Sequence, residues 1–273
     1  MIKKGNYLLT AVPLFVGLGI QIICGTMAGR LYPVFYAMAW ESDWDILELY
    51  NSIIIYVLIL AQILEFIVFG VWYIQQNRGR EVRPFTQVVH VKTIGCIIFL
   101  GIGLQLLTNL FLQALYLLFP NLLDAYMKLV EAAGIEQMNM GSLLATVILA
   151  PVVEEIIFRG ITMRIAQKAG AGFIAANLIQ AVAFGIYHLN LIQGVYAALL
   201  GLVLGYAAYR YGSIYPSILL HFVYNFSATL LHVTGTCLPD TMAVRILILA
   251  VTVVTMLLGI WFFRTDKKRE SLN

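Results

Sequence analysis

Long apolar runs separated by short polar segments extend over most of the chain. A transmembrane helix needs about 20 mostly apolar residues. Eight stretches approach that length: 7–28, 52–74, 93–119, 143–165, 173–188, 193–211, 214–233 and 243–263. The fifth is the shortest, and residues 190–193 after it suit either a loop or a tight turn. The pattern predicts an all-α bundle of about eight transmembrane helices in a multi-pass protein of the cell membrane.

Two segments between the apolar runs have a pattern of their own. Residues 30–51 are aromatic and acidic, which suits an interfacial loop or short helix with Trp40, Trp44 and Tyr50 at the level of the lipid headgroups. Residues 120–140 place apolar side chains at helical spacing. They predict an amphipathic surface helix that ends near Gly134.

The composition agrees with a membrane protein that has little room for a soluble domain. The 273 residues are 61% hydrophobic and only 11% charged, whereas soluble domains carry about 25% charged residues. We therefore treat residues 1–273 as one membrane domain. Its parts are 1–141 with the first three spans, 142–234 with the next four, and 243–273 with the last span and a basic tail.

The distribution of basic residues predicts how the bundle is oriented. Most of the 17 Lys and Arg residues fall on one side of an eight-span arrangement, for example Arg78, Arg80 and Arg83 after the second span and Arg264 to Arg269 after the last. Short cytoplasmic loops are enriched in such residues. This rule places both termini in the cytoplasm.

Two carboxylates and a guanidinium interrupt the fourth apolar run. A charged side chain at membrane depth costs roughly 2.5–3.5 kcal/mol on insertion scales, so Glu154, Glu155 and Arg159 require an explanation. Glu155 and Arg159 are four residues apart, share a helix face and can pair. Glu154 lies about 100° further round the helix. We interpret Glu155–Arg159 as scaffold and Glu154 as the working acid or base.

Polar side chains also interrupt the neighbouring spans. The fifth carries His188, with Phe184 one turn earlier, and the seventh carries His221 and Asn225 on one face. Glu65 in the second span is the main other ionisable group, and we expect it to pair with a polar group on a neighbouring helix. In the sixth span, Ala197, Gly201 and Gly205 are four residues apart and favour close helix packing.

The two carboxylates, two imidazoles and one amide suit the hydrolysis of an amide bond. A carboxylate can take a proton from water, and an imidazole can hold that water or return the proton to a leaving amine. A second imidazole and a carboxamide can donate hydrogen bonds to a developing oxyanion. The same groups could instead hold zinc, with Glu154, His188 and His221 as ligands, although the chain contains no H-E-x-x-H pattern.

Three motifs resemble those of a known family, the CAAX-type prenyl endopeptidase and bacteriocin-processing (CPBP, or Abi) intramembrane proteases. They are Glu154-Glu155-x-x-x-Arg159, Phe184-x-x-x-His188 and His221-x-x-x-Asn225, in the family's order. The flanking sequences Tyr187-His188-Leu189-Asn190 and Gly212 to His221 are also similar. The resemblance extends over residues 142–229.

The resemblance implies an eight-helix membrane bundle with the site in its core. It implies that Glu154 activates the attacking water with help from His188, that His221 and Asn225 stabilise the oxyanion, and that Glu155 and Arg159 support Glu154. It implies a peptide or lipidated protein as substrate and membrane lipids as surroundings, with no role for nucleic acid. It leaves open whether the peptidase is a metalloprotease or a glutamate protease. It also leaves open whether the protein processes prenylated proteins, processes signal peptides or confers self-immunity to bacteriocins.

Two other functions fit parts of the pattern. In a proton- or ion-coupled transporter the same carboxylates and histidines would relay protons or bind the substrate, but no inverted repeat, which many transporters have, is evident. A non-catalytic membrane scaffold would keep its biological role without Glu154. One discrepancy concerns depth, since these spans place Glu154 and Asn225 near mid-membrane but His188 near the outer end of its span.

Overall fold

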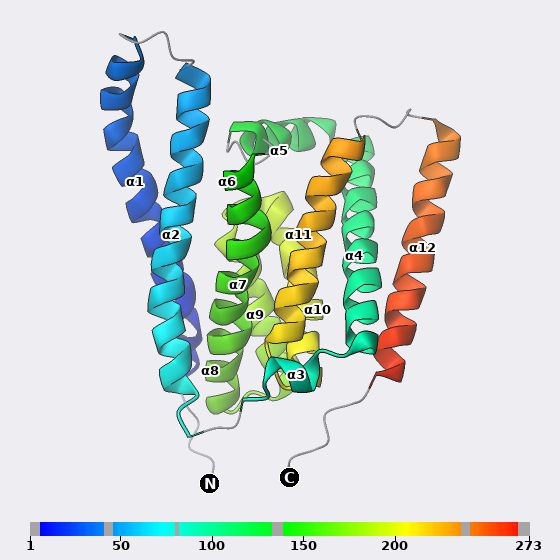
Figure 1. Ribbon diagram of the computed structural model, residues 1–273. Coiled ribbons are helices and arrows are strands. Elements are labelled where there is room, and N and C mark those ends of the chain that lie inside the picture. Colours follow the sequence, from blue (N-terminus) through cyan, green and yellow to red (C-terminus); the bar gives the residue numbers. More distant parts are fainter. Residues whose placement is uncertain (1–5, 41–45, 80–81, 133–138, 236–240, 267–273) are drawn as a thin grey trace.

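The computed structural model describes residues 6–40, 46–79, 82–132, 139–235 and 241–266. In these ranges the chain is helical with no strand, which confirms the predicted all-α class. Most of the helices run side by side as a bundle (Figure 1). The start of α1 and the end of α12 lie at the same end of that bundle, as an even number of crossings requires.

The first half of the chain forms one long hairpin, a third long helix and a helix that lies across the end of the bundle (Figure 1). Its elements are η1 (Tyr7–Ala11), α1 (Val12–Trp40), α2 (Ile46–Gln76), α3 (Phe85–Val88), α4 (Val91–Leu118) and α5 (Pro120–Ala132).

The second half holds the motif-bearing helices. Its elements are α6 (Met140–Leu143), η2 (Leu144–Leu149), α7 (Ala150–Glu155), η3 (Ile156–Thr162), α8 (Met163–Lys168), α9 (Phe173–Tyr187), α10 (Leu191–Tyr211), α11 (Tyr215–Gly235) and α12 (Met242–Thr265). The five elements from α6 to α8 follow one another without a break and form one composite helix, Met140–Lys168.

Six helices in the described ranges are long and apolar enough to cross a membrane, the composite helix among them. The α9 helix is apolar but has only 15 residues. The α11 helix is not among the six, and it carries the polar side chains of Ser217, His221 and Asn225. Both helices lie within the same bundle (Figure 1), so the multi-pass architecture is as predicted.

The prediction of an interfacial loop or short helix at residues 30–51 was wrong. The α1 helix continues to Trp40 and α2 begins at Ile46, so the two helices extend beyond the rest of the bundle (Figure 1). The segment is rich in Ala, Met, Leu and Glu, which favour helix, and α1 accommodates Pro33. Trp44 lies outside the described residues.

The predicted amphipathic helix is confirmed as α5, which lies across one end of the bundle (Figure 1). Its Leu123 and Tyr126 pack against Ile192 at the start of α10. The hydroxyls of Tyr126 and Tyr196 are 2.9 Å apart. The expected end near Gly134 lies outside the described residues. This helix therefore covers the region where α9 turns into α10.

The connection between α9 and α10 is a tight turn of three residues. Leu189 has a φ of 53°, in the left-handed region that non-glycine residues seldom adopt. The side chain of Asn190 accepts a hydrogen bond from the Gln193 amide at 3.1 Å and caps α10. His188 is thus held at the end of a short helix, inside the bundle and beneath α5.

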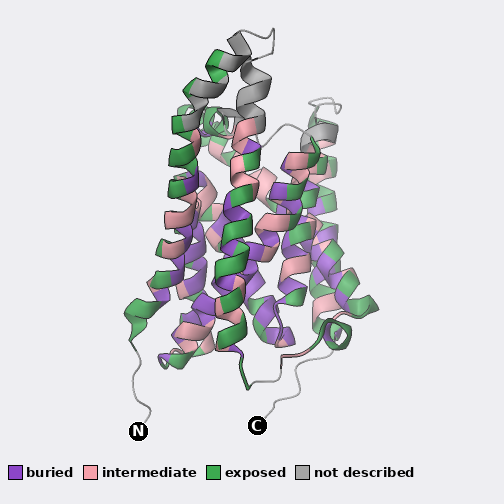
Figure 2. Ribbon diagram, turned by 60° about the vertical axis from the view of Figure 1, so that its left-hand side comes forward, coloured by how far each residue is buried: buried purple, intermediate pink, exposed green. Residues whose placement is uncertain are grey.

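Buried residues are concentrated where helices face one another, and exposed ones on the outside of the bundle (Figure 2). One apolar core joins α1, α2, the composite helix, α9 and α10, around residues such as Phe69, Ile157 and Phe184. A second joins α4, α10, α11 and α12. Large apolar side chains such as Leu8, Ile74 and Leu257 are exposed, as expected for surfaces that face lipid.

Glycines allow two pairs of helices to pack with their backbones close together. A Cβ atom on Gly259 of α12 would lie 2.8 Å from the Leu100 amide nitrogen of α4, and one on Gly103 would lie 3.1 Å from the Met256 amide nitrogen. On α10, a Cβ on Gly201 would lie 3.2 Å from the Ala181 Cα of α9. The close packing predicted from the spacing of Ala197, Gly201 and Gly205 is therefore present.

We predict that Gly259→Ala lowers the free energy of unfolding by about 1–3 kcal/mol, because the added methyl group meets backbone and forces α12 away from α4. Thermal unfolding in detergent would measure the effect. Gly70→Ala in α2 is the matched control, since a Cβ there has no neighbour within 4 Å. An equal loss in both variants would contradict the prediction.

Candidate active site

The two adjacent carboxylates lie on a short α-helix between two π-helical segments. The α7 helix ends with Glu154 and Glu155, η2 precedes it and η3 follows it. Segments of π-helix are rare and are frequent at functional sites. The composite helix is therefore least regular next to the residues that the motifs identify.

The π-helical segment η2 leaves a backbone carbonyl for Asn225. The Ala150 amide donates to the Ala145 carbonyl, five residues back, instead of to Thr146. Residue 151 is proline and has no N–H to donate. The Thr146 carbonyl instead accepts a hydrogen bond from Asn225 Nδ2 at 2.8 Å. This bond orients Asn225 and uses one of its two amide hydrogens.

Glu155 is fully buried and bonded to two other motif residues. Its Oε1 accepts from Arg159 Nη1 at 2.8 Å and lies 3.0 Å from His221 Nδ1. Arg159 also donates through Nη2 to the Gly201 carbonyl of α10 at 3.2 Å. A buried charge requires such partners, and the predicted pairing of Glu155 with Arg159 is confirmed.

Glu154 is more accessible than Glu155. Its side chain is 13% exposed, whereas that of Glu155 is 0% exposed. Its Oε2 lies 3.6 Å from His221 Nε2, too far for a direct hydrogen bond but close enough for one to form after a small movement. The imidazole of His221 therefore lies between the two carboxylates.

The end of α9 determines which nitrogen of His188 carries a hydrogen. The amide of His188 donates to the Gly185 carbonyl, so the Phe184 carbonyl lacks its usual helical partner. His188 Nδ1 lies 2.9 Å from that carbonyl. A carbonyl can only accept, so Nδ1 must be the donor, and in the neutral imidazole Nε2 keeps a lone pair. His188 is half-buried.

Phe184 brings the two histidines and the arginine together. Its ring makes edge contacts with His188 at 4.9 Å and with His221 at 5.7 Å between centroids. The Arg159 guanidinium carbon lies 4.5 Å from the centroid of the same ring. The side chains of three motifs on three helices therefore meet around one buried phenyl ring.

This arrangement resolves the apparent difference in depth between His188 and the other residues. The α9 helix is short and its turn lies beneath α5, so His188 does not reach the outer surface of the bundle. Glu154, Glu155, Arg159, His188 and His221 belong to one cluster. Asn225 lies one turn beyond His221 and is bonded to the composite helix.

Sequence reasoning missed two amide side chains that support Arg159. Gln180 of α9 is fully buried and donates to the Gly201 carbonyl at 2.8 Å and to Asn177 at 2.7 Å. Asn177 donates in turn to the Leu202 carbonyl at 3.0 Å. Gly205 makes room for both, since a Cβ there would lie 1.9 Å from the Asn177 side-chain oxygen. Their polarity within an apolar span was the available signal.

The side chains as placed do not assemble a metal site. Among the described residues, no three His, Cys, Asp or Glu side chains could hold a metal ion together. His221 and His188 each direct Nδ1 to a protein acceptor and keep Nε2 free, an arrangement that metal-ligating histidines also have. The misfit of the ligand set Glu154, His188 and His221 therefore lies in how the three side chains are placed relative to one another and not in their donor atoms.

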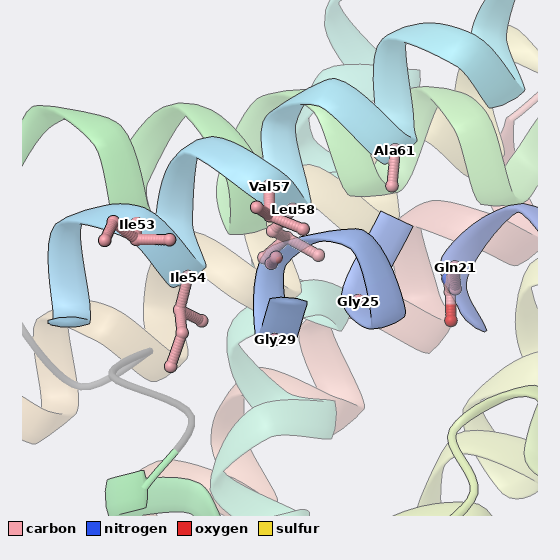
Figure 3. Close-up of a pocket in the computed structure, with 9 residues that line it drawn as sticks. Gln21, Gly25, Gly29, Ile53, Ile54, Val57, Leu58 and Ala61 are labelled. Carbon is pink, nitrogen blue, oxygen red and sulfur yellow. The ribbon is translucent and has the colours of Figure 1, made fainter. Parts of the chain in front are cut away.

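A pocket of 730 Å³ lies between α1 and α2 (Figure 3). Apolar residues and glycines line it, including Gly25, Ile54 and Leu58, together with Gln21 as its polar group. Gln21 also donates a hydrogen bond to the hydroxyl of Tyr187, the residue before His188. The pocket therefore adjoins the Gln21–Tyr187 contact next to His188, and none of the motif residues lines it.

The match to a family model covers the helices that carry the cluster. Residues 136–227 match the model described as type II CAAX prenyl endopeptidase Rce1-like. Comparisons with curated proteins and with solved structures gave no match. The matched range contains all three motifs, and the family is the one that they predict. The chain is thus a multi-pass membrane protein that carries, over residues 136–227, a domain of the type II CAAX prenyl endopeptidase Rce1-like family.

Proposed function

We propose that this protein is an intramembrane endopeptidase in which Glu154 and His188 activate the attacking water. The observation that carries the proposal is that the residues of the cluster fall into an accessible set and a buried set. Glu154, His188 and Asn225 are half-buried and can meet a substrate, whereas Glu155, Arg159 and His221 are buried and bonded to one another. Each of the three accessible groups belongs to a different motif.

In the proposed reaction a water molecule lies between Glu154 and the Nε2 lone pair of His188. Glu154 takes a proton from the water while the oxygen of the water forms a bond to the peptide carbonyl carbon. The carbonyl oxygen becomes an oxyanion. The carbon–nitrogen bond then breaks, and the leaving amine takes the proton from Glu154. The products are a new carboxyl group and a new amino group, and the carboxylate of Glu154 is restored.

Asn225 is the proposed donor to the oxyanion. Its Nδ2 has a second hydrogen beyond the one that binds the Thr146 carbonyl, and that bond fixes the direction of the amide. Oriented donors of this kind stabilise the transition state because they need no rearrangement during the reaction. Asn225 thus has the role that the family resemblance implies.

The geometry favours a different role for His221 from the one implied by the resemblance. Glu155 is paired with Arg159 and is therefore an acceptor, so His221 Nδ1 carries the hydrogen between them. Neutral His221 then presents a lone pair on Nε2 towards Glu154. We propose that Nε2 accepts a hydrogen bond from Glu154 after Glu154 has taken the proton, and that it can donate to an oxyanion only as an imidazolium.

The proposed substrate is a peptide held at the membrane by a lipid. This rests on the family match and on the position of the cluster inside a bundle of apolar helices. The pocket between α1 and α2 has the apolar lining that the lipid part of such a substrate needs. The substrate sequence and the cleavage position are left to the experiment.

We predict that Glu154→Gln and His188→Gln each lower the cleavage rate by about 10²–10⁴-fold, the usual contribution of a general base, without unfolding the protein. Purified protein in liposomes would be given prenylated and unmodified peptides, with and without a chelator, and the products identified by mass spectrometry. Asp124→Asn changes an exposed acid on α5 and is the control.

Cleavage that persists in Glu154→Gln would contradict this proposal. Loss of cleavage on chelation, restored by zinc, would contradict the metal-free mechanism but not the peptidase. If no peptide is cleaved while a biological phenotype survives in Glu154→Gln, the scaffold function would replace the enzyme. Substrate-dependent flux across the liposome membrane without cleavage would favour a transporter.

A separate prediction concerns the support of the site. Glu155→Gln leaves the Arg159 charge buried without its anion, and we expect the free energy of unfolding to fall by about 3–5 kcal/mol. The double variant Glu155→Gln/Arg159→Gln should recover part of this loss, because no charge is then unpaired. Thermal unfolding in detergent would measure both. Glu154→Gln, which breaks no ion pair with Arg159, is the control, and an equal loss there would argue against the division of roles.

A further inference from the structure

A second buried carboxyl group, Glu65, lies in the described bundle outside the three motifs. It belongs to α2 and is 1% exposed. An ionisable residue inside a membrane is costly to bury and is functional or paired by default. The proposed mechanism makes no use of Glu65, so its presence needs a separate explanation.

The partner of Glu65 is Tyr187, the last residue of α9. The Tyr187 hydroxyl donates to Glu65 Oε1 at 2.6 Å and accepts a hydrogen bond from Gln21 Nε2 of α1. The expectation that Glu65 pairs with a polar group on a neighbouring helix is confirmed. One hydroxyl therefore joins three helices, and it lies on the residue next to His188.

The Tyr187 ring is enclosed as well as hydrogen-bonded. It meets the Phe158 ring edge-on, with 5.3 Å between centroids. On the opposite helix, a Cβ atom on Gly17 would lie 3.0 Å from the ring and 3.5 Å from Glu65 Oε1, so α1 passes close by. The side chain has little freedom to move as long as its hydroxyl is held.

His188 depends on the same turn of helix that Tyr187 terminates. Its Nδ1 is bonded to the Phe184 carbonyl, and its amide to the Gly185 carbonyl, both within the last turn of α9. The next residue, Leu189, has a positive φ, which is unfavourable for a non-glycine residue and requires support from its surroundings. The last turn of a helix is also where fraying begins.

We propose that Glu65 is a positioning residue: together with Gln21 it holds the Tyr187 hydroxyl and so fixes the last turn of α9, which sets the orientation of His188. If the bond served only to join the helices, it could lie at any depth along them. The bond observed lies one residue from His188. The effect on cleavage rests on the proposed function, whereas the effect on His188 does not.

The required property of Glu65 is its ability to accept a hydrogen bond. The side-chain oxygen of glutamine can also accept from a tyrosine hydroxyl, whereas leucine does not accept at all. Glu65→Gln should therefore behave as wild type, within about threefold. Glu65→Leu and Tyr187→Phe should lower kcat by about 10–100-fold with little change in KM, because a small displacement of a catalytic group has effects of this size.

The matched control is Tyr211→Phe. Tyr211 of α10 also donates to a carboxylate, Asp266 Oδ2 at 2.8 Å, but at the end of the bundle where α12 terminates. Tyr211→Phe removes the same kind of hydrogen bond at a place away from His188. Thermal unfolding of all four variants would separate loss of stability from loss of positioning.

The test that does not depend on cleavage is NMR of protein labelled with ¹⁵N-histidine. The chain has four histidines, and the His188 signals can be assigned with His188→Gln. In the wild type they should report a single tautomer with hydrogen on Nδ1. We expect Tyr187→Phe and Glu65→Leu to shift or broaden them, and Glu65→Gln and Tyr211→Phe to leave them unchanged.

The proposal would be overturned if the His188 signals were the same in all four variants. It would also be overturned if Glu65→Gln behaved like Glu65→Leu, since the charge would then matter and not the acceptor. If no variant and no wild-type protein cleaves any peptide while the His188 signals change as expected, the proposed function fails and the positioning of His188 by Glu65 stands.

Discussion

The buried ion pair between Glu155 and Arg159 is the interaction on which the rest of the site depends. Neither group is stable in an apolar bundle without the other. Arg159 is held further by the Gly201 carbonyl and lies against Phe184, so the pair also connects the composite helix to α9 and α10. Glu155 in turn fixes one nitrogen of His221. The position of His221 relative to Glu154 follows from these contacts.

Interruptions in regular helix provide the remaining geometry. The π-helical segment before Glu154, with Pro151 after it, leaves the Thr146 carbonyl to orient Asn225. The early end of α9 leaves the Phe184 carbonyl to orient His188. In an uninterrupted helix these carbonyls would be bonded to backbone amides. These local departures from regular helix thus orient the side chains of Asn225 and His188.

The sequence was sufficient for the class of fold and for the members of the cluster, because each charged or polar residue in an apolar span is conspicuous. Spacing alone paired Glu155 with Arg159. It predicted the extent of α9 within one residue, but it did not reveal that His188 lies beneath α5, because the packing of α5 over that turn is a contact between distant residues. Nor did it reveal Gln180 or the Glu65–Tyr187 bond, because such contacts between distant spans depend on how the helices pack. The length of α1 was underestimated for a different reason, because the aromatic and acidic residues of 30–51 indicated an interface although other residues there favour helix.

The central claim is that Glu154 acts on water and does not hold the substrate. The most direct test is the affinity of a cleavable lipidated peptide for Glu154→Gln, measured beside the wild type under conditions that prevent turnover. We expect a Kd within a few-fold of the wild-type value in a variant that no longer cleaves. A loss of binding that matches the loss of cleavage would contradict it, because Glu154 would then be a substrate-binding residue.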